Sequence, residues 1–344
     1  MTKSKRIFLI ADFKDESAQS IRIERRHWIK GFIRLGHDVQ RFSYRNILLQ
    51  QSPFKSVKAS RMVAKKRTDN ILMEQLKHYH PDIVMIAMMF VDADTVANMR
   101  KVAPNAFFVG REVSCPGRFS PSLEIARQMD LVIASNADKY LKAYKEAGAT
   151  RCAFIPCPCE PDIQRPYNDV DKRFKTDIVF TGKAGHKMNE SDNVRYEIVS
   201  RLLEMPNAKV YGALGSPRIE GIDCFYALSG AKIALSINVV NNVRLYHSDR
   251  LFNSLSCGTF VLAKNVPDSE LLFQDGKHLR YFDTTEEFFE LADYYLHNDL
   301  EREKIARAGM ERAQTEFNCV KMAQHVLDLI EKGSYKADWA QYDI

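Results

Sequence analysis

The sequence predicts an α/β protein of two domains, each with a mostly parallel sheet and helices on both of its faces. Short apolar, β-branched runs alternate with longer helical patterns through the first half of the chain. Residues 157–176, which are rich in proline and charge, interrupt this order, and the same alternation then restarts. The 344 residues suffice for two domains with separate cores. Two Rossmann-like, doubly wound domains joined by a hinge are the expected architecture.

The first domain is expected to span residues 1–156. Its strands are predicted at the apolar runs Arg6–Ala11, Asp38–Ser43, Asp82–Met88, Ala106–Gly110, Leu131–Ser135 and Cys152–Pro156. Helical periodicity predicts helices near Ile21–Leu35, Arg61–His78, Asp94–Lys101, Ser122–Met129 and Lys139–Ala147. Gly36 and Gly148 stand where a left-handed residue commonly ends a helix.

The second domain is expected at residues 177–332, after a linker at 157–176 and before a tail at 333–344. Strands are predicted at Asp177–Thr181, Lys209–Tyr211, Lys232–Asn238 and Phe260–Ala263. Helices are predicted at Asn193–Leu203, Asp249–Cys257, Thr285–His297, Leu300–Phe317 and Val320–Lys332.

Composition favours a cytoplasmic globular protein. Hydrophobic residues make up 45% and charged residues 27%, and no apolar stretch is long enough for a membrane-spanning helix. The first apolar run ends at Asp12 without a small-residue cleavage site, so we expect a strand there, not a signal peptide. Seven cysteines, an odd number, favour reduced thiols. Cys152, Cys157 and Cys159 cluster without a second ligand pair, which favours a buried turn over a zinc site.

Residues 41–67 contain eight basic side chains and no acid. This run predicts an anionic partner, which would be a membrane surface (the inner face, for a cytoplasmic protein), a phosphorylated lipid carrier or DNA. Aromatic residues are few in the run, so a stacking platform for bases is poorly supported. A solvated helix and loop without a partner is the alternative interpretation.

The segment Ala231–Asn265 predicts an anion-binding α/β unit. An apolar run, Ile233–Val240, is followed by a helix that Ser248 or Asp249 can cap, with Arg250 in its first turn. Gly258 ends that helix, and a second buried strand follows at once. A helix N-terminus with a guanidinium beside it favours a bound anion.

A looser phosphate site is predicted where the strand DIVFTG runs into the loop Lys183–Lys187. A glycine-containing turn exposes backbone N–H groups, and Lys183 and Lys187 supply the charge that a diphosphate needs. The alternative is an ordinary strand-to-helix loop with surface lysines. Neither G-x-G-x-x-G nor G-x-x-x-x-G-K-[ST] occurs, so the sequence gives no support to dinucleotide or P-loop binding.

Several segments together resemble the group 1 glycosyltransferases, and especially their spore-maturation-protein (CgeB-like) branch. RLFNSLSCGTFVLA, VPDSELLFQDGKHLRYFDTTEEFFELADYYL and EREKIARAGMERAQTEFN are similar to the C-terminal domain of that family. GREVSCPGRF and DLVIASNADKYLKAYKEAGATRCAFIPCPCEPD look like the same branch in the first half. The resemblance implies a GT-B fold, in which two Rossmann-like domains face a central cleft. It places the acceptor on the N-terminal domain and a nucleotide-diphosphate sugar on the C-terminal one.

The resemblance also implies donor-binding residues. They are Lys183, Lys187, His247, Asp249, Arg250 and Asn253. Arg250 would contact the donor diphosphate, and this charge would replace a metal ion. Asn253 stands where the wider family often keeps a glutamate that hydrogen-bonds the donor ribose or sugar, and this departure puts the retaining mechanism in doubt. His247 would bond a phosphate or the sugar, or remain uncommitted.

Two carboxylates are candidates for the general base that takes the acceptor's proton. Glu112 follows the predicted strand AFFVG at a sheet end and matches an acidic position of the family branch. The alternative for Glu112 is a salt bridge with Arg111 or Arg118. Asp12, just beyond the first strand, is a weaker candidate for the same task.

Asp92-Ala93-Asp94 resembles the D-x-D metal motif of GT-A glycosyltransferases, but an Asp that caps the following helix is the favoured interpretation. We therefore expect a metal-independent transferase that moves a sugar to a carbohydrate, lipid-linked or nucleic-acid hydroxyl. The alternatives are a DNA-modifying glycosyltransferase, a non-catalytic nucleotide-binding partner in a glycan assembly, and a related sugar epimerase.

Overall fold

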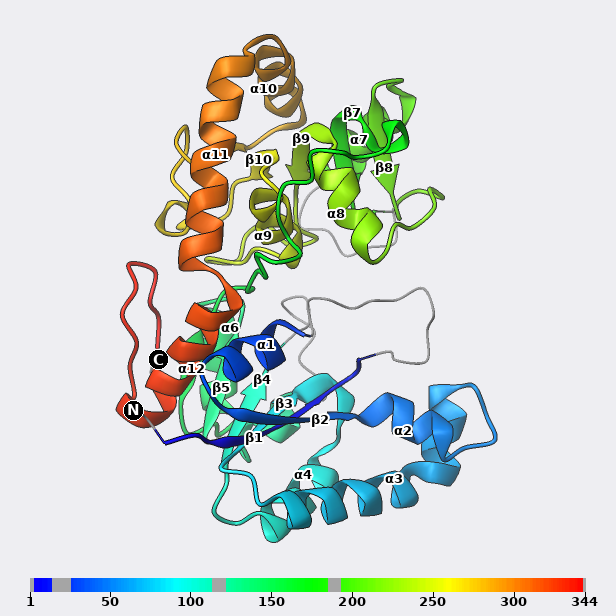
Figure 1. The fold of residues 1–344 in the computed structure, drawn as a ribbon, viewed down its shortest axis with the longest axis vertical. Coiled ribbons are helices and arrows are strands. Elements are labelled where there is room, and N and C mark those ends of the chain that lie inside the picture. The colour runs from blue at the N-terminus through cyan, green and yellow to red at the C-terminus, as the bar shows by residue number, and fades with distance from the viewer. Residues whose placement is uncertain (1–2, 14–25, 113–121, 185–192, 343–344) are drawn as a thin grey trace. The chain divides into compact units, whose positions relative to one another are not determined.

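The computed structural model describes residues 3–13, 26–112, 122–184 and 193–342 (Figure 1). The chain divides into two compact units. Unit 1 comprises residues 1–155 and 322–344, and unit 2 comprises residues 156–321. Each unit contains one parallel sheet with helices packed on it, which confirms the predicted fold class. No helix in the described ranges is long and apolar enough to cross a bilayer.

Unit 1 is built on a six-stranded sheet of order β2-β1-β3-β4-β5-β6, with all neighbours parallel. Its strands are β1 (Arg6–Ala11), β2 (Asp38–Ser43), β3 (Ile83–Ala87), β4 (Phe107–Arg111), β5 (Leu131–Ala134) and β6 (Cys152–Phe154). All residues of β3 and β5 are buried, as expected where helices cover both faces of a parallel sheet. This double burial explains why unbroken apolar runs predicted the strands.

The helices of unit 1 follow the predicted alternation. They are α1 (His27–Arg34), α2 (Tyr44–Gln50), α3 (Val57–Tyr79), α4 (Ala93–Val102), α5 (Ser122–Ala126), α6 (Lys139–Glu146) and most of α12 (Cys319–Lys332). Gly36 and Gly148 have φ angles of 87° and 101°, so both stand in the left-handed region just after α1 and α6. A short 3₁₀ turn, η2 (Met88–Phe90), connects β3 to α4.

The C-terminal segment 322–344 belongs to unit 1, whereas the sequence division placed residues up to 332 in the second domain. Burial explains the difference. Trp339 is 2% exposed and packs edge-on against Phe154 at the end of β6. The Tyr335 hydroxyl donates to the Phe154 carbonyl at 2.6 Å, and Arg151 Nη1 donates to the Leu329 carbonyl at 2.7 Å.

Unit 2 has a five-stranded parallel sheet of order β11-β10-β9-β7-β8. Its strands are β7 (Thr176–Thr181), β8 (Ala208–Tyr211), β9 (Ala231–Ser236), β10 (Phe260–Lys264) and β11 (Arg280–Phe282). Its helices are α7 (Val194–Glu204), α8 (Ile222–Ser229), α9 (Asp249–Ser256), α10 (Thr285–His297) and α11 (Asp299–Glu316). Side chains of all five strands form its core with α7, α10 and α11. Because the strands are parallel, their carboxyl ends stand at one edge of the sheet.

The predicted linker 157–176 lies within unit 2. The 3₁₀ turn η3 (Lys172–Phe174) leads directly into β7. Nearer the start of the segment, Cys159 N donates to the Phe317 carbonyl, and Cys319 N donates to the Cys159 carbonyl, both at 2.8 Å. Main-chain hydrogen bonds thus join the segment around Cys159 to the segment around residues 317–319.

Candidate functional site

Arg250 lies at the carboxyl edge of the unit 2 sheet, where β7 and β9 are neighbours. Its Nε donates to the carbonyl of Thr181, the last residue of β7. Its Nη1 donates to the carbonyl of Ile237, just after β9, at 2.7 Å. The planar fork of a guanidinium suits two such acceptors at once. The first turn of α9 therefore holds a cation where a parallel sheet commonly binds ligands.

Gly182 makes room for this guanidinium. Its φ angle is 152°, and a Cβ built on it would collide with Arg250 Nη2. The sequence predicted a phosphate-binding turn at this glycine. The structure adds a second reason for the residue, which is the close approach of the Arg250 side chain. Lys183 is exposed in the same turn, and Lys187 lies outside the described residues.

The charge on Arg250 has no anion in contact with it among the described residues. Its guanidinium touches two main-chain carbonyls and lies 4.9 Å from the centroid of the Phe180 ring. Burial, followed by repulsion from Arg195, lowers the pKa of Arg250 to about 9. It therefore stays protonated at neutral pH, and a bound anion would relieve the cost of its burial.

Arg195 is a site residue that sequence reasoning missed. It stands in the first turn of α7, is 2% exposed and donates through Nη2 to the Lys183 carbonyl. Its guanidinium carbon lies 5.6 Å from the centroid of the same Phe180 ring. Two guanidiniums thus flank the loop after β7. A basic residue that opens the helix after the glycine loop is the signal that would have found it.

The N-terminus of α9 lacks a side-chain cap. Ser248 is the N-cap residue, as predicted, but its side chain makes no capping hydrogen bond. Its Oγ has no hydrogen-bond partner among the described residues. The Ser248 amide donates to Asn238 Oδ1 at 3.0 Å, and the Asn238 side chain donates to the Tyr246 carbonyl at 2.9 Å. The loop is held from behind, while the first turn, in which Asp249 is partly exposed, keeps N–H groups for an anion.

His247 is buried beside this helix start. It is 2% exposed, and its Nε2 lies 2.9 Å from Ser269 Oγ. Its ring stacks on Tyr281 with centroids 6.5 Å apart. Burial lowers the pKa of His247 to about 3, so the ring is neutral at physiological pH. These contacts resemble those of a packing residue more than those of a phosphate ligand.

Asn253 already has a partner in unit 2. Its Oδ1 accepts from Gln164 Nε2, and Gln164 is 1% exposed. The Gln164 Oε1 in turn accepts from the amide of the fully buried Glu160. The position that the family resemblance assigned to the donor therefore joins α9 to residues 160–164.

Glu112 and Asp12 follow β4 and β1 and so stand at the same edge of the unit 1 sheet. Glu112 is 5% exposed, and its Oε2 accepts from the Tyr144 hydroxyl. Burial, and then the charge of Glu112, raise the pKa of Tyr144, so the phenol stays a donor. Asp12 is 2% exposed, with Oδ2 3.7 Å from Arg45 Nη1. Of the two salt-bridge partners considered for Glu112, Arg118 lies outside the described residues.

Asp92 caps α4, as favoured over a metal motif. Its Oδ1 accepts from the Thr95 amide at 3.0 Å, and its Oδ2 lies 3.3 Å from Lys65 Nζ. Asp94 lies exposed in the first turn of the helix. Within the ranges that the structure describes, no group of three or more His, Cys, Asp or Glu residues could hold a metal ion.

Comparison with known proteins bears on the fold and on the family of unit 2. Residues 187–328 match a family described as glycosyl transferase-like. The structure of HepE from Anabaena with UDP and glucose is similar at 11% identity and a TM-score of 0.63, covering 95% of this chain and 99% of that chain. No curated protein matches the sequence closely enough to count as a relative.

Two other solved structures have a similar fold. Sucrose-phosphate synthase from Thermosynechococcus elongatus has 12% identity and a TM-score of 0.69, covering 95% of this chain and 98% of that chain. An α-glucosyltransferase in complex with UDP-glucose and DNA containing an abasic site has 12% identity and a TM-score of 0.66, covering 96% and 100%. These neighbours show that the chain has the GT-B fold, and residues 187–328 of it match the glycosyl transferase-like family.

Proposed function

We propose that this protein is a glycosyltransferase that moves a sugar from a nucleotide-diphosphate sugar, bound on unit 2, to a hydroxyl acceptor bound on unit 1. The acceptor hydroxyl belongs to a carbohydrate, a lipid-linked glycan or a nucleic acid, and the setting is glycan or surface-polysaccharide synthesis in the cytoplasm. The observation that carries the proposal is Arg250, whose guanidinium contacts two main-chain carbonyls and no carboxylate among the described residues, in the first turn of a helix without a side-chain cap. The narrower kinship with the CgeB-like branch is part of the proposal.

The leaving diphosphate is the species that this edge of unit 2 suits. As the glycosidic bond breaks, negative charge builds on the bridging phosphate oxygen, and fixed cations and N–H groups stabilise that charge most in the transition state. Arg250 and the first turn of α9 supply this cation and these N–H groups, and Lys183 and Lys187 contribute further positive charge from the loop. In this mechanism their charge takes the role that a divalent ion plays in other transferases.

Glu112 is the proposed general base. It would accept the proton of the acceptor hydroxyl as that oxygen attacks the anomeric carbon. The hydroxyl of Tyr144 orients the carboxylate by donating to Oε2. Asp12 is the second candidate, on the same sheet edge.

Calorimetric titration of UDP, GDP, ADP, dTDP and CMP tests the donor site, first with EDTA and then with manganese. UDP is the first ligand to try, because HepE was solved with UDP. We expect one diphosphate to bind without metal, and Arg250→Ala to weaken it about 10- to 150-fold, the effect of losing a charged hydrogen bond. The control is Arg307→Ala, which removes an exposed arginine of α11.

Arg250→Lys separates charge from geometry, because lysine keeps the charge and loses the fork. It should recover only part of the affinity that alanine loses. Binding that requires manganese and ignores Arg250 would contradict the assignment. Binding of nucleotide with no turnover across an acceptor panel would favour a non-catalytic partner instead.

A further inference from the structure

The start of α3 and the loop before it form an exposed surface that mixes basic and apolar side chains. We call it the α3 surface. It consists of Phe54, Lys55, Lys58, Arg61, Met62, Val63, Lys66 and Arg67. All of these residues are exposed, and the sequence between 41 and 67 contains no acid that would neutralise them.

Helical spacing defines the outward face. The residues of α3 that point into unit 1 recur every fourth position, at Ser60, Ala64 and Thr68. On the opposite side of a helix with 3.6 residues per turn, Lys58, Met62 and Lys66 therefore stand one above the other. Met62 is 83% exposed and Val63 54% exposed. Apolar atoms thus stand at the centre of a face bordered by cations.

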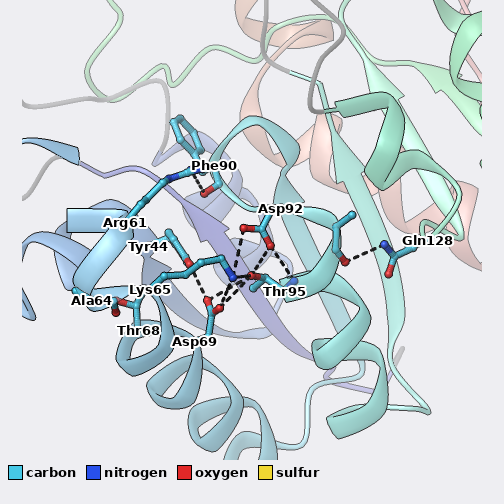
Figure 2. Close-up of polar contacts among 11 residues, drawn as sticks. Tyr44, Arg61, Ala64, Lys65, Thr68, Asp69, Phe90, Asp92, Thr95 and Gln128 are labelled. Carbon is cyan, nitrogen blue, oxygen red and sulfur yellow. Dashed lines mark hydrogen bonds and ion pairs between the residues drawn. The ribbon is translucent and has the colours of Figure 1, made fainter. Parts of the chain in front are cut away.

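Lys65 belongs to the same basic run but points inward (Figure 2). Its Nζ lies 2.6 Å from Asp69 and 3.3 Å from Asp92, and Tyr44 donates to Asp69 at 2.6 Å. This network ties α3 to α2 and to the start of α4. The carboxylates of Asp69 and Asp92 are therefore engaged by Lys65, which is not part of the α3 surface.

A fourth exposed apolar residue, Met89, belongs to the turn that Arg61 contacts. Arg61 Nη2 donates to the Phe90 carbonyl of η2 at 3.3 Å, as Figure 2 shows. The neighbouring Met89 is 40% exposed. Phe54, in the loop before α3, is 48% exposed. Single exposed apolar residues are common. Four of them in the start of α3, the loop before it and the turn η2 are an unusual concentration.

We propose that the α3 surface binds unit 1 to an anionic lipid bilayer. Its lysines and arginines contact lipid phosphates, and Phe54, Met62 and Val63 enter the boundary between headgroups and acyl chains. DNA would account for the cations but not for the apolar centre, because duplex phosphates offer Met62 nothing apolar to cover it. The proposal concerns unit 1 alone and does not depend on the donor site in unit 2.

Flotation of the full chain with vesicles tests the proposal. We expect binding to phosphatidylcholine vesicles that contain phosphatidylserine, little binding to phosphatidylcholine alone, and a loss of binding in high salt. Lys58→Glu/Lys66→Glu should weaken partitioning at least 25-fold, since each cation near such a surface contributes about fivefold. The control is Lys77→Glu/Lys101→Glu, which changes the net charge equally at exposed lysines of the same unit.

The apolar contribution needs its own variant. Met62→Ser/Val63→Ser should weaken vesicle binding, whereas Leu300→Ser, at a site 88% exposed in unit 2, should not. Phe54→Trp should give a blue-shifted emission with anionic vesicles if that side chain enters the bilayer.

Two results would overturn the proposal. One is equal vesicle binding by the lysine variant and its control. The other is strong, salt-dependent affinity for a labelled DNA duplex, lost in Lys58→Glu/Lys66→Glu, without vesicle binding. Neither result bears on nucleotide binding by unit 2, so this proposal and the donor site can fail separately.

Discussion

Gly182→Ala tests the geometry of the proposed donor site more directly than removing Arg250. The φ angle of Gly182 is 152°, and its missing Cβ leaves the space that Arg250 Nη2 occupies. An alanine there should cost about 1–3 kcal/mol of stability from backbone strain alone. It should also push the guanidinium off the Thr181 carbonyl, so that the charge no longer faces the anion. Losing one charged hydrogen bond to the diphosphate costs about 1.5–3 kcal/mol, or about 10- to 150-fold in nucleotide affinity.

Gly276→Ala is the matched control. Gly276 has a φ angle of 67°, and no atom would lie within 4 Å of a Cβ at this position. Its substitution by alanine therefore measures the cost of backbone strain without a steric collision. Chemical denaturation gives the stability of each variant, and calorimetry gives the affinity. A double-mutant cycle with Arg250→Ala completes the test, because Gly182→Ala should then have no further effect on binding. Normal nucleotide affinity in Gly182→Ala would refute the placement of Arg250.

Three further predictions address other parts of the chain. Glu112→Gln keeps an acceptor for Tyr144 but cannot take a proton, so transfer should fall about 10²- to 10⁴-fold with donor binding unchanged, measured by product formation and calorimetry. Burial lowers the pKa of His247 to about 3, from 6.5 in the unfolded chain, which therefore takes up a proton that the native state excludes. The free energy of unfolding should therefore fall by up to about 1.4 kcal/mol per pH unit as the pH drops from 6.5 toward 3. Urea denaturation at several pH values should show that this free energy depends less on pH in His247→Asn. Trp339→Ala should cost about 3–5 kcal/mol in unit 1, seen as an earlier denaturation transition, while nucleotide affinity stays the same.

Local patterns predicted most of the fold because inner parallel strands such as β3 and β5 are buried on both faces and read as apolar runs. The bounds of β1 and β2 agree with the prediction at both ends. Three elements escaped it. β11 (Arg280–Phe282) is too short for an apolar run to stand out, and α8 starts after Gly221 at a φ angle of 64° without a side-chain cap. α2 also starts without a capping hydrogen bond.

The site was less predictable because its contacts join segments far apart in the chain. Arg250 and the glycine turn after β7 were visible locally as a helix start and a strand end. Arg195 was missed because it lies near Phe180 only once α7 packs on the sheet, and the local sequence does not show that contact. Tyr144, the partner of Glu112, comes from a helix beyond the next strand. A contact of this kind leaves no local pattern in the sequence, whereas an adjacent charge such as Arg111 does.

The pairing of Arg195 with Arg250 has an energetic meaning for the proposed function. Each guanidinium lies near the Phe180 ring, and repulsion from Arg195 contributes to the lowered pKa of Arg250. The fold therefore holds two like charges near one aromatic ring, and each guanidinium donates to a main-chain carbonyl. A bound diphosphate would cancel the repulsion as well as form its own hydrogen bonds. This repulsion therefore favours whichever state places the most negative charge near the two arginines. In sugar transfer that state is the one in which the diphosphate departs.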